Sequence, residues 1–113
     1  MAASEPGPMD GAFNVRTEPR GNALVVRASG EVDIASAKSL EKEIQSAFDR
    51  DGAGVFLDLE DVTYIDSTGL AVLLRAQKVS SADGHKLRIS LLSSPVEEAI
   101  KMTGLDGAFP LME

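Results

Sequence analysis

The sequence predicts a single small α/β domain with a mixed, mostly parallel sheet of four to five strands and helices packed against it. Three observations carry this prediction. The chain has 113 residues, which suits one domain with its own hydrophobic core. Its apolar residues follow a strand-like pattern in some segments and a helical spacing in others. These segments alternate along most of the chain, which implies parallel strand pairs joined by right-handed crossovers.

The N-terminal part predicts a leader followed by a β-hairpin. Residues 1–11 are rich in Gly, Pro, Ala and Ser, so we expect a disordered leader ahead of a domain over residues 12–113. Apolar and polar residues alternate over 13–17, and residues 23–28 form a second strand-like run. Gly21 and Asn22 between the two runs signal a turn.

The next segment predicts a helix and a buried strand. Apolar residues recur at helical spacing from Ile34 to Phe48, with Asp33 as the expected N-cap. Asp51 and Gly52 end this helix. The run over 55–59 is mostly apolar and predicts a central strand.

A second helix is expected from the segment around Ser67 to the Asp-Gly pair at 83–84. Its apolar face holds Leu70, Leu73, Leu74 and Val79. Val72 and Arg75 lie on the neighbouring face, where we expect them to be open to a partner.

The C-terminal part predicts a strand over 86–92 and a third helix that ends near Gly104. Ser94 and Pro95, followed by two glutamates, are typical of a helix start. Met102 is expected to pack in the core, and residues 108–112 to form a last edge strand. The predicted order is ββαβαβα(β).

Composition argues against several classes of function. The net charge of −7 disfavours nucleic acid and anionic membranes as partners. No cysteine is present, and no run is apolar enough to be a membrane span or a signal peptide, so we expect a cytoplasmic protein. Because no nucleotide-binding motif occurs, we expect no cofactor and no small-molecule substrate.

Two strand-to-helix junctions, over 30–33 and 64–70, are the candidate site. If the strands before them are parallel, Asp33 and Ser67 lie on the same edge of the sheet, where α/β sheets place their sites. Ser67 would begin a helix, and a helix N-terminus tolerates an added phosphate. Gly69 would let a partner's backbone or a nucleotide approach closely. An alternative stays open, since Asp66, Ser67 and Thr68 are also ordinary capping residues.

A hydrolase using Ser67 as nucleophile is a further alternative. It would need a histidine base, and the sole histidine, His85, follows a turn at the start of a predicted strand, where a surface position is expected. We therefore predict that the protein is not an enzyme.

Two motifs resemble one known family. The run VFLDLEDVTYIDSTGLAVLL is similar to the signature of anti-sigma factor antagonists, which belong to the STAS domain family, and GEVDIASA resembles the segment before that family's first helix. The resemblance covers about residues 13–112. Ala71 departs from the glycine that the family often has, and the chain stops at Glu113 where relatives commonly continue into a C-terminal helix.

The resemblance implies a phosphorylation switch. It implies that the unphosphorylated protein binds an anti-sigma factor, which is also a serine kinase, and so frees a sigma factor for transcription. Ser67 matches the phosphate acceptor, Thr68 matches a second acceptor of some relatives, and Asp33 matches an acidic residue that helps dock the kinase. Asp66 and Gly69 belong to the same partner-binding motif, and a serine phosphatase would reverse the modification. The alternative is a STAS-like scaffold subunit of a stress-signalling or transport complex that binds partners without this switch.

Overall fold

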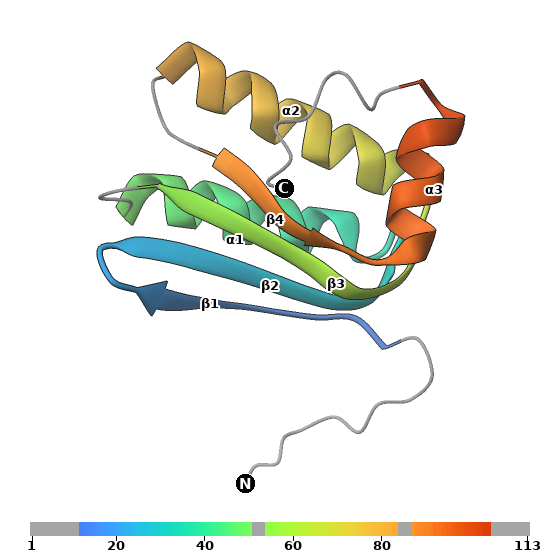
Figure 1. Ribbon diagram of the computed structural model, residues 1–113, viewed down its shortest axis with the longest axis horizontal. Coiled ribbons are helices and arrows are strands. Elements are labelled where there is room, and N and C mark those ends of the chain that lie inside the picture. Colours follow the sequence, from blue (N-terminus) through green and yellow to red (C-terminus); the bar gives the residue numbers. More distant parts are fainter. Residues whose placement is uncertain (1–11, 51–53, 84–86, 105–113) are drawn as a thin grey trace, which may run out of the picture.

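The computed structural model describes residues 12–50, 54–83 and 87–104, and shows a four-stranded sheet with three helices (Figure 1). The order is ββαβαβα, as predicted. The bounds of the elements are β1 (Asn14–Arg20), β2 (Ala23–Val32), α1 (Ala37–Arg50), β3 (Val55–Ile65), α2 (Ser67–Asp83), β4 (Leu87–Leu92) and α3 (Ser94–Met102).

The sheet is mixed and mostly parallel, which confirms the predicted class. Its strands lie in the order β1-β2-β3-β4. The pair β1/β2 is antiparallel, whereas β2/β3 and β3/β4 are parallel. Arg20 lies opposite Ala23, so the predicted turn has only two residues, and Gly21 takes a φ of +65° that favours glycine.

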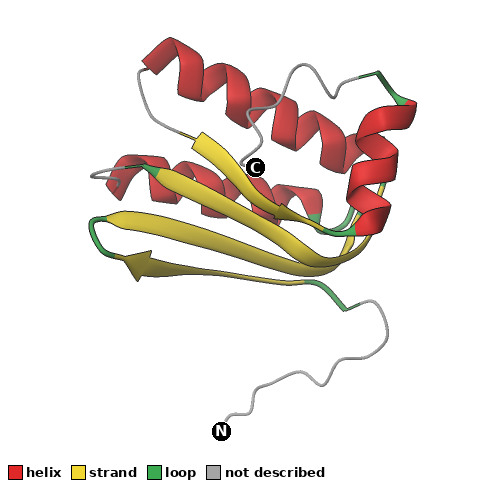
Figure 2. Cartoon of the chain, in the orientation of Figure 1, coloured by secondary structure: helices red, strands yellow, loops and turns green. Residues whose placement is uncertain are grey.

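Helices α1 and α2 lie side by side on one face of the sheet, and α3 lies at the end where β3 and β4 finish (Figure 2). Both β-α-β crossovers run in the same direction along the sheet, which brings their helices to the same face. The core fills the space between the helices and the sheet. Its largest fully buried side chains include Leu40, Ile44, Leu57, Leu59, Leu73, Ile89 and Ile100.

Three strands extend further than the sequence pattern predicts, and β2 is one of them, running to Val32 rather than to residue 28. The prediction ended one strand at residue 59, but β3 continues past the exposed Glu60 and Asp61 to Ile65, because Val62 and Ile65 are still buried. Strand β1 continues through Pro19, which an edge strand tolerates.

The structure contradicts the predicted exposure of three side chains. Ile34 precedes α1 rather than lying on its apolar face, and its side chain is 79% exposed. Val72 was expected to face a partner but is 1% exposed, because α2 packs against α1 as well as the sheet. Met102 was expected in the core but is 82% exposed at the last residue of α3.

Other predictions lie outside the described residues: the leader over 1–11, His85 and the edge strand over 108–112. Within the described part, no helix combines the length and apolar character needed to cross a membrane.

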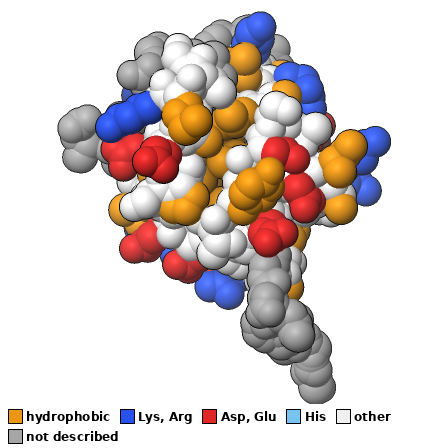
Figure 3. Space-filling view, turned by 90° about the vertical axis from the view of Figure 1, so that its right-hand side faces the viewer, with side chains coloured by type: hydrophobic (Ala, Val, Ile, Leu, Met, Phe, Trp, Pro, Cys, Tyr) orange, Lys and Arg blue, Asp and Glu red, His pale blue; other side chains and the backbone are white. Residues whose placement is uncertain are grey.

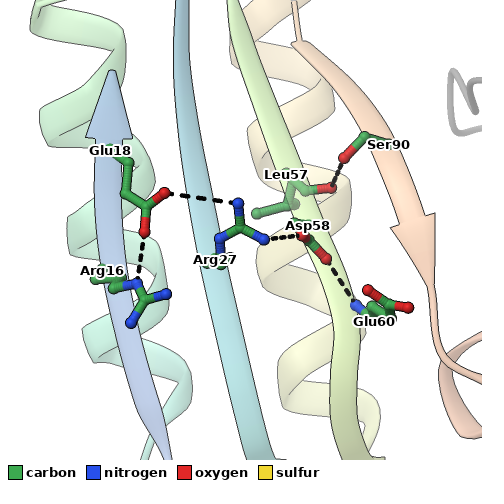
Figure 4. Close-up of polar contacts among 7 residues, drawn as sticks. All are labelled: Arg16, Glu18, Arg27, Leu57, Asp58, Glu60 and Ser90. Carbon is green, nitrogen blue, oxygen red and sulfur yellow. Dashed lines mark hydrogen bonds and ion pairs between the residues drawn. The ribbon is translucent and has the colours of Figure 1, made fainter. Parts of the chain in front are cut away.

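The sheet face opposite α1 and α2 carries an ion-pair cluster that joins three strands (Figure 4). Arg27 of β2 contacts Asp58 of β3 at 2.6 Å and Glu18 of β1 at 3.5 Å. Glu18 also pairs with Arg16 at 2.8 Å. Asp58 is 5% exposed whereas the Arg27 side chain is 33% exposed, so the pair is partly removed from water and joins β2 to β3.

Candidate functional site

The two predicted junctions meet at the carboxyl-terminal edge of the parallel strands. Val32 at the end of β2 pairs with Ile65 at the end of β3. One residue further on, the backbone amide of Asp66 donates to the carbonyl of Val32 at 3.2 Å. The segments that begin with Asp33 and Ser67 therefore start next to each other, as the parallel pairing predicted.

Asp66 is the N-cap of α2. Its Oδ1 accepts hydrogen bonds from the amides of Thr68 at 2.9 Å and Gly69 at 3.2 Å, and also from the Thr68 hydroxyl. The Thr68 hydroxyl bond is the main cause that lowers the pKa of the Asp66 carboxyl, and the amides of Gly69 and Thr68 lower it further against the opposing effect of burial. Asp66 is therefore held as a carboxylate at the start of the helix.

Ser67 and Thr68 are adjacent but differ in what their hydroxyls do. The Thr68 side chain is half-buried and its hydroxyl donates to Asp66. Ser67 is exposed, and among the described residues no hydrogen bond engages its hydroxyl. The capping explanation therefore accounts for Asp66 and Thr68 but leaves Ser67 without a structural role.

Gly69 faces the interior, which contradicts the expected role in approach of a partner. A Cβ at this position would lie 2.7 Å from the Val32 side chain and 2.7 Å from the Ile65 side chain. The glycine lets the first turn of α2 sit close to the ends of β2 and β3. Glycine at this position therefore allows close packing within the domain.

Asp33 caps a tight turn before α1 rather than α1 itself. Its Oδ1 accepts from the amides of Ala35 at 3.0 Å and Ser36 at 3.2 Å. The Ser36 hydroxyl accepts from the Asp33 amide at 3.0 Å and donates to the Glu31 carbonyl at 2.7 Å. These bonds hold Ile34 at the exposed tip of the turn.

Ile34 is a surface feature of the site that the sequence did not reveal. Its spacing to Ala37 and Leu40 fits a helical apolar face, so periodicity alone places it in the core. The hydrogen bonds of Asp33 and Ser36 form a turn instead, so α1 begins only at Ala37, about one helical turn after Ile34.

Two open grooves flank the start of α2, each with a volume of about 390 Å³. The α1–α2 groove is bordered by Ile34 and Thr68, and the Arg75–Glu41 ion pair crosses it with N–O distances of 2.8 and 3.1 Å. The α2–α3 groove is bordered by Ser67 and Met102. Figure 3 looks onto this end of the molecule and shows apolar side chains in its middle with acidic ones to either side.

With this geometry established, similarity to known proteins decides the family. A model of the STAS domain family matches residues 14–113. The chain belongs to the STAS domain family. This confirms the resemblance carried by the two junction motifs.

Several relatives of this STAS domain are named anti-sigma factor antagonists. The anti-sigma-B factor antagonist of Bacillus subtilis (strain 168) is 33% identical over 93 residues, covering 82% of this chain and 84% of the relative. The anti-sigma F factor antagonist of Paenibacillus polymyxa is 26% identical over 102 residues, covering 89% and 87%. The crystal structure of an anti-sigma factor antagonist from Mycobacterium paratuberculosis matches with a TM-score of 0.77 at 26% identity, covering 88% and 85%.

Proposed function

We propose that this STAS domain is an anti-sigma factor antagonist whose binding to its partner is switched off when Ser67 is phosphorylated. The partner would be an anti-sigma factor that is also a serine kinase, and a serine phosphatase would restore the active form. The domain over residues 12–113 would act in the cytoplasm as a regulatory module, without catalytic residues of its own.

The observation that carries this proposal is the exposed, unengaged hydroxyl of Ser67 at the N-terminus of α2. Thr68, the other candidate acceptor, already donates its hydroxyl to Asp66. Phosphorylating Thr68 would remove that donor and place new charge against the capping carboxylate. Phosphorylating Ser67 leaves every capping bond of Asp66 in place.

The chemistry needs only the kinase and ATP. The Ser67 oxygen attacks the γ-phosphorus of ATP, ADP leaves, and the hydroxyl proton passes to a base on the kinase. The phosphate adds a charge of about −1.5 to −2 at a helix N-terminus that tolerates anions. The fold therefore survives, whereas a partner packed closely on Ser67 meets new bulk and new charge.

Asp33 would help dock the kinase and its nucleotide-bound metal. Its turn begins beside the Asp66 amide, on the same edge as Ser67. Asp66, Thr68 and the turn around Asp33 would form the surface that the kinase reads, with Gly69 shaping that surface from within.

The experiment that tests the proposal is phosphate transfer with matched serine and threonine variants. The protein is incubated with ATP and the serine kinases encoded beside sigma factors in its own genome, and intact mass and peptide mapping follow. We expect one phosphate on Ser67, none in Ser67→Ala, and a rate in Thr68→Ser close to that of the unaltered chain.

Binding measurements distinguish the phosphorylation switch from its main alternative, a scaffold subunit that lacks the switch. We expect Ser67→Glu to lose binding to the anti-sigma factor while Ser67→Ala keeps it. Equal binding by both variants, with no kinase able to modify Ser67, would instead support a scaffold subunit that lacks the switch.

A further inference from the structure

The α2–α3 groove combines an apolar floor with acidic edges right beside Ser67. Its apolar lining includes Leu70 and Ala99, and the more exposed Tyr64 and Met102 stand at its border. Tyr64 is 49% exposed and Met102 is 82% exposed, so both offer contact area that the domain itself does not use.

The charges of the two grooves differ in sign. Of the residues that the structure describes, two acids, Asp66 and Glu98, and no basic residue line the α2–α3 groove. The α1–α2 groove is lined by Lys38 and Arg75 against the single acid Glu41. Ser67 lines only the acidic groove, and Thr68 only the other.

Phosphorylation of Ser67 therefore acts on a groove that is already acidic. The added charge strengthens attraction for a basic group that lies in this groove. A partner that binds there through a basic side chain gains affinity when the phosphate arrives. This is the opposite of the change that releases the kinase, so the groove suits an enzyme that must prefer the phosphorylated form.

We propose that the α2–α3 groove is the docking surface for the serine phosphatase that acts on Ser67, and that it receives an apolar side chain flanked by basic residues. This inference rests on the proposed function. The reaction is hydrolysis: water attacks the phosphorus, the bond from phosphorus to the Ser67 oxygen breaks, and inorganic phosphate leaves as the serine hydroxyl recovers its proton.

The test uses full-length protein that carries phosphoserine at position 67 by genetic incorporation, so it does not depend on a kinase. The probe is a soluble extract of the cells from which the sequence comes, and the measured quantity is the rate of phosphate loss from the added protein. We expect Glu98→Lys and Met102→Ser each to lower this rate about fivefold or more, as contact residues of an interface do.

Two matched controls lie outside the groove lining. Glu97→Lys makes the same charge change one residue away, at a glutamate outside the groove lining that pairs with Lys101 at 3.6 Å. Leu91→Ser removes an apolar side chain that is 47% exposed on the sheet face opposite α1 and α2, away from both grooves. Both controls should keep the rate of the unaltered phosphorylated chain, and thermal melting checks that every variant is folded.

The outcomes separate the inference from the proposed function. Unchanged dephosphorylation of both folded groove variants, or no dephosphorylation of the unaltered chain, would overturn the phosphatase surface. A parallel kinase assay with the same variants should give unchanged phosphorylation for Glu98→Lys and Met102→Ser. If these variants instead lose phosphorylation and keep dephosphorylation, the groove belongs to the kinase. Failure of every kinase to modify Ser67 would count against the proposed function alone.

Discussion

Asp66 determines the local structure at the start of α2, because one carboxylate oxygen accepts from two amides and one hydroxyl. Removing an N-cap side chain usually costs about 1 kcal/mol of unfolding free energy. We expect Asp66→Ala to lose about that amount at neutral pH, measured by urea unfolding. Asp66→Asn, which keeps an acceptor oxygen, should lose less.

The Asp66 carboxylate also makes the stability of the folded protein depend on pH. The pKa of Asp66 is lowered in the folded protein, mainly by the Thr68 hydroxyl. A lowered pKa adds stability that is complete above the unfolded value of about 3.9 and is lost as pH falls through the folded value. The stability deficit of Asp66→Ala should therefore shrink below about pH 4. A deficit that stays constant from neutral pH to about pH 2.5 would contradict this assignment.

At Gly69, packing predicts that a substitution by alanine lowers stability, although helix propensity alone would predict that it raises stability. In an exposed helix, Gly→Ala stabilises by about 0.5–1 kcal/mol. Here the new methyl group would lie 2.7 Å from both Val32 and Ile65. We expect Gly69→Ala to lower the free energy of unfolding by about 1–3 kcal/mol, as overpacking does. A variant more stable than the unaltered chain would show that this end of the sheet is loosely packed.

Some of these residue roles could be read from the sequence and others could not. The D-S-T-G run predicted that Asp66 and its neighbours begin a helix, because capping is a local property of a few consecutive residues. The roles of Gly69 and Ile34 were predicted wrongly, since each depends on neighbours that are distant in the sequence. Gly69 touches Val32 across 37 positions, and Ile34 is exposed because a hydrogen-bonded turn displaces it from α1.

At the scale of elements, the Arg27–Asp58 pair joins β2 to β3 on the face without α1 and α2. Removing one member of a buried pair commonly costs about 3–5 kcal/mol. The Arg27 side chain is 33% exposed, so we expect a smaller loss of about 2–3 kcal/mol for Asp58→Ala in urea unfolding. The double variant Arg27→Met with Asp58→Leu should recover most of that loss. Equal losses in both proteins would show instead that the ion pair itself, rather than the cost of the unpaired Arg27 charge, accounts for the lost stability.

The elements themselves were predictable in type and order, but their lengths were less so. Strand β3 was predicted to end at residue 59, just before the two consecutive acids Glu60 and Asp61. In the structure, Asp58 is buried with an arginine, and Glu60 and Asp61 point outward while Val62 and Ile65 return to the core. Charged residues therefore do not end this strand: Asp58 is buried beside Arg27, and Glu60 and Asp61 face solvent while later residues return to the core.

At the scale of the molecule, one core connects the sheet with all three helices. Leu40 of α1 is 0% exposed and Ile100 of α3 is 2% exposed, and both belong to the same apolar cluster. We expect Leu40→Ala and Ile100→Ala each to lower the unfolding free energy by about 2–5 kcal/mol, in one cooperative transition.

The exposed neighbour Met102 provides the control for this prediction. Met102→Ala should change stability by less than about 0.5 kcal/mol, because surface substitutions rarely do more. Within each variant, circular dichroism and the fluorescence of Tyr64, the single tyrosine, should report the same unfolding midpoint. A separate early transition in Ile100→Ala alone would show that α3 unfolds independently of the rest.

The sequence by itself determined the fold class, the order of the elements, the family and the junction that holds Ser67. These follow from local patterns: the period of apolar residues, turn and capping residues, and a motif of consecutive residues. Only the tertiary structure decided which residues of those patterns are covered. It buried Val72, exposed Ile34 and Met102, turned Gly69 inward, and placed Ser67 and Thr68 in grooves of different charge. The reason is that the burial of a side chain depends on which elements pack together. That packing brings together residues that are far apart in the chain.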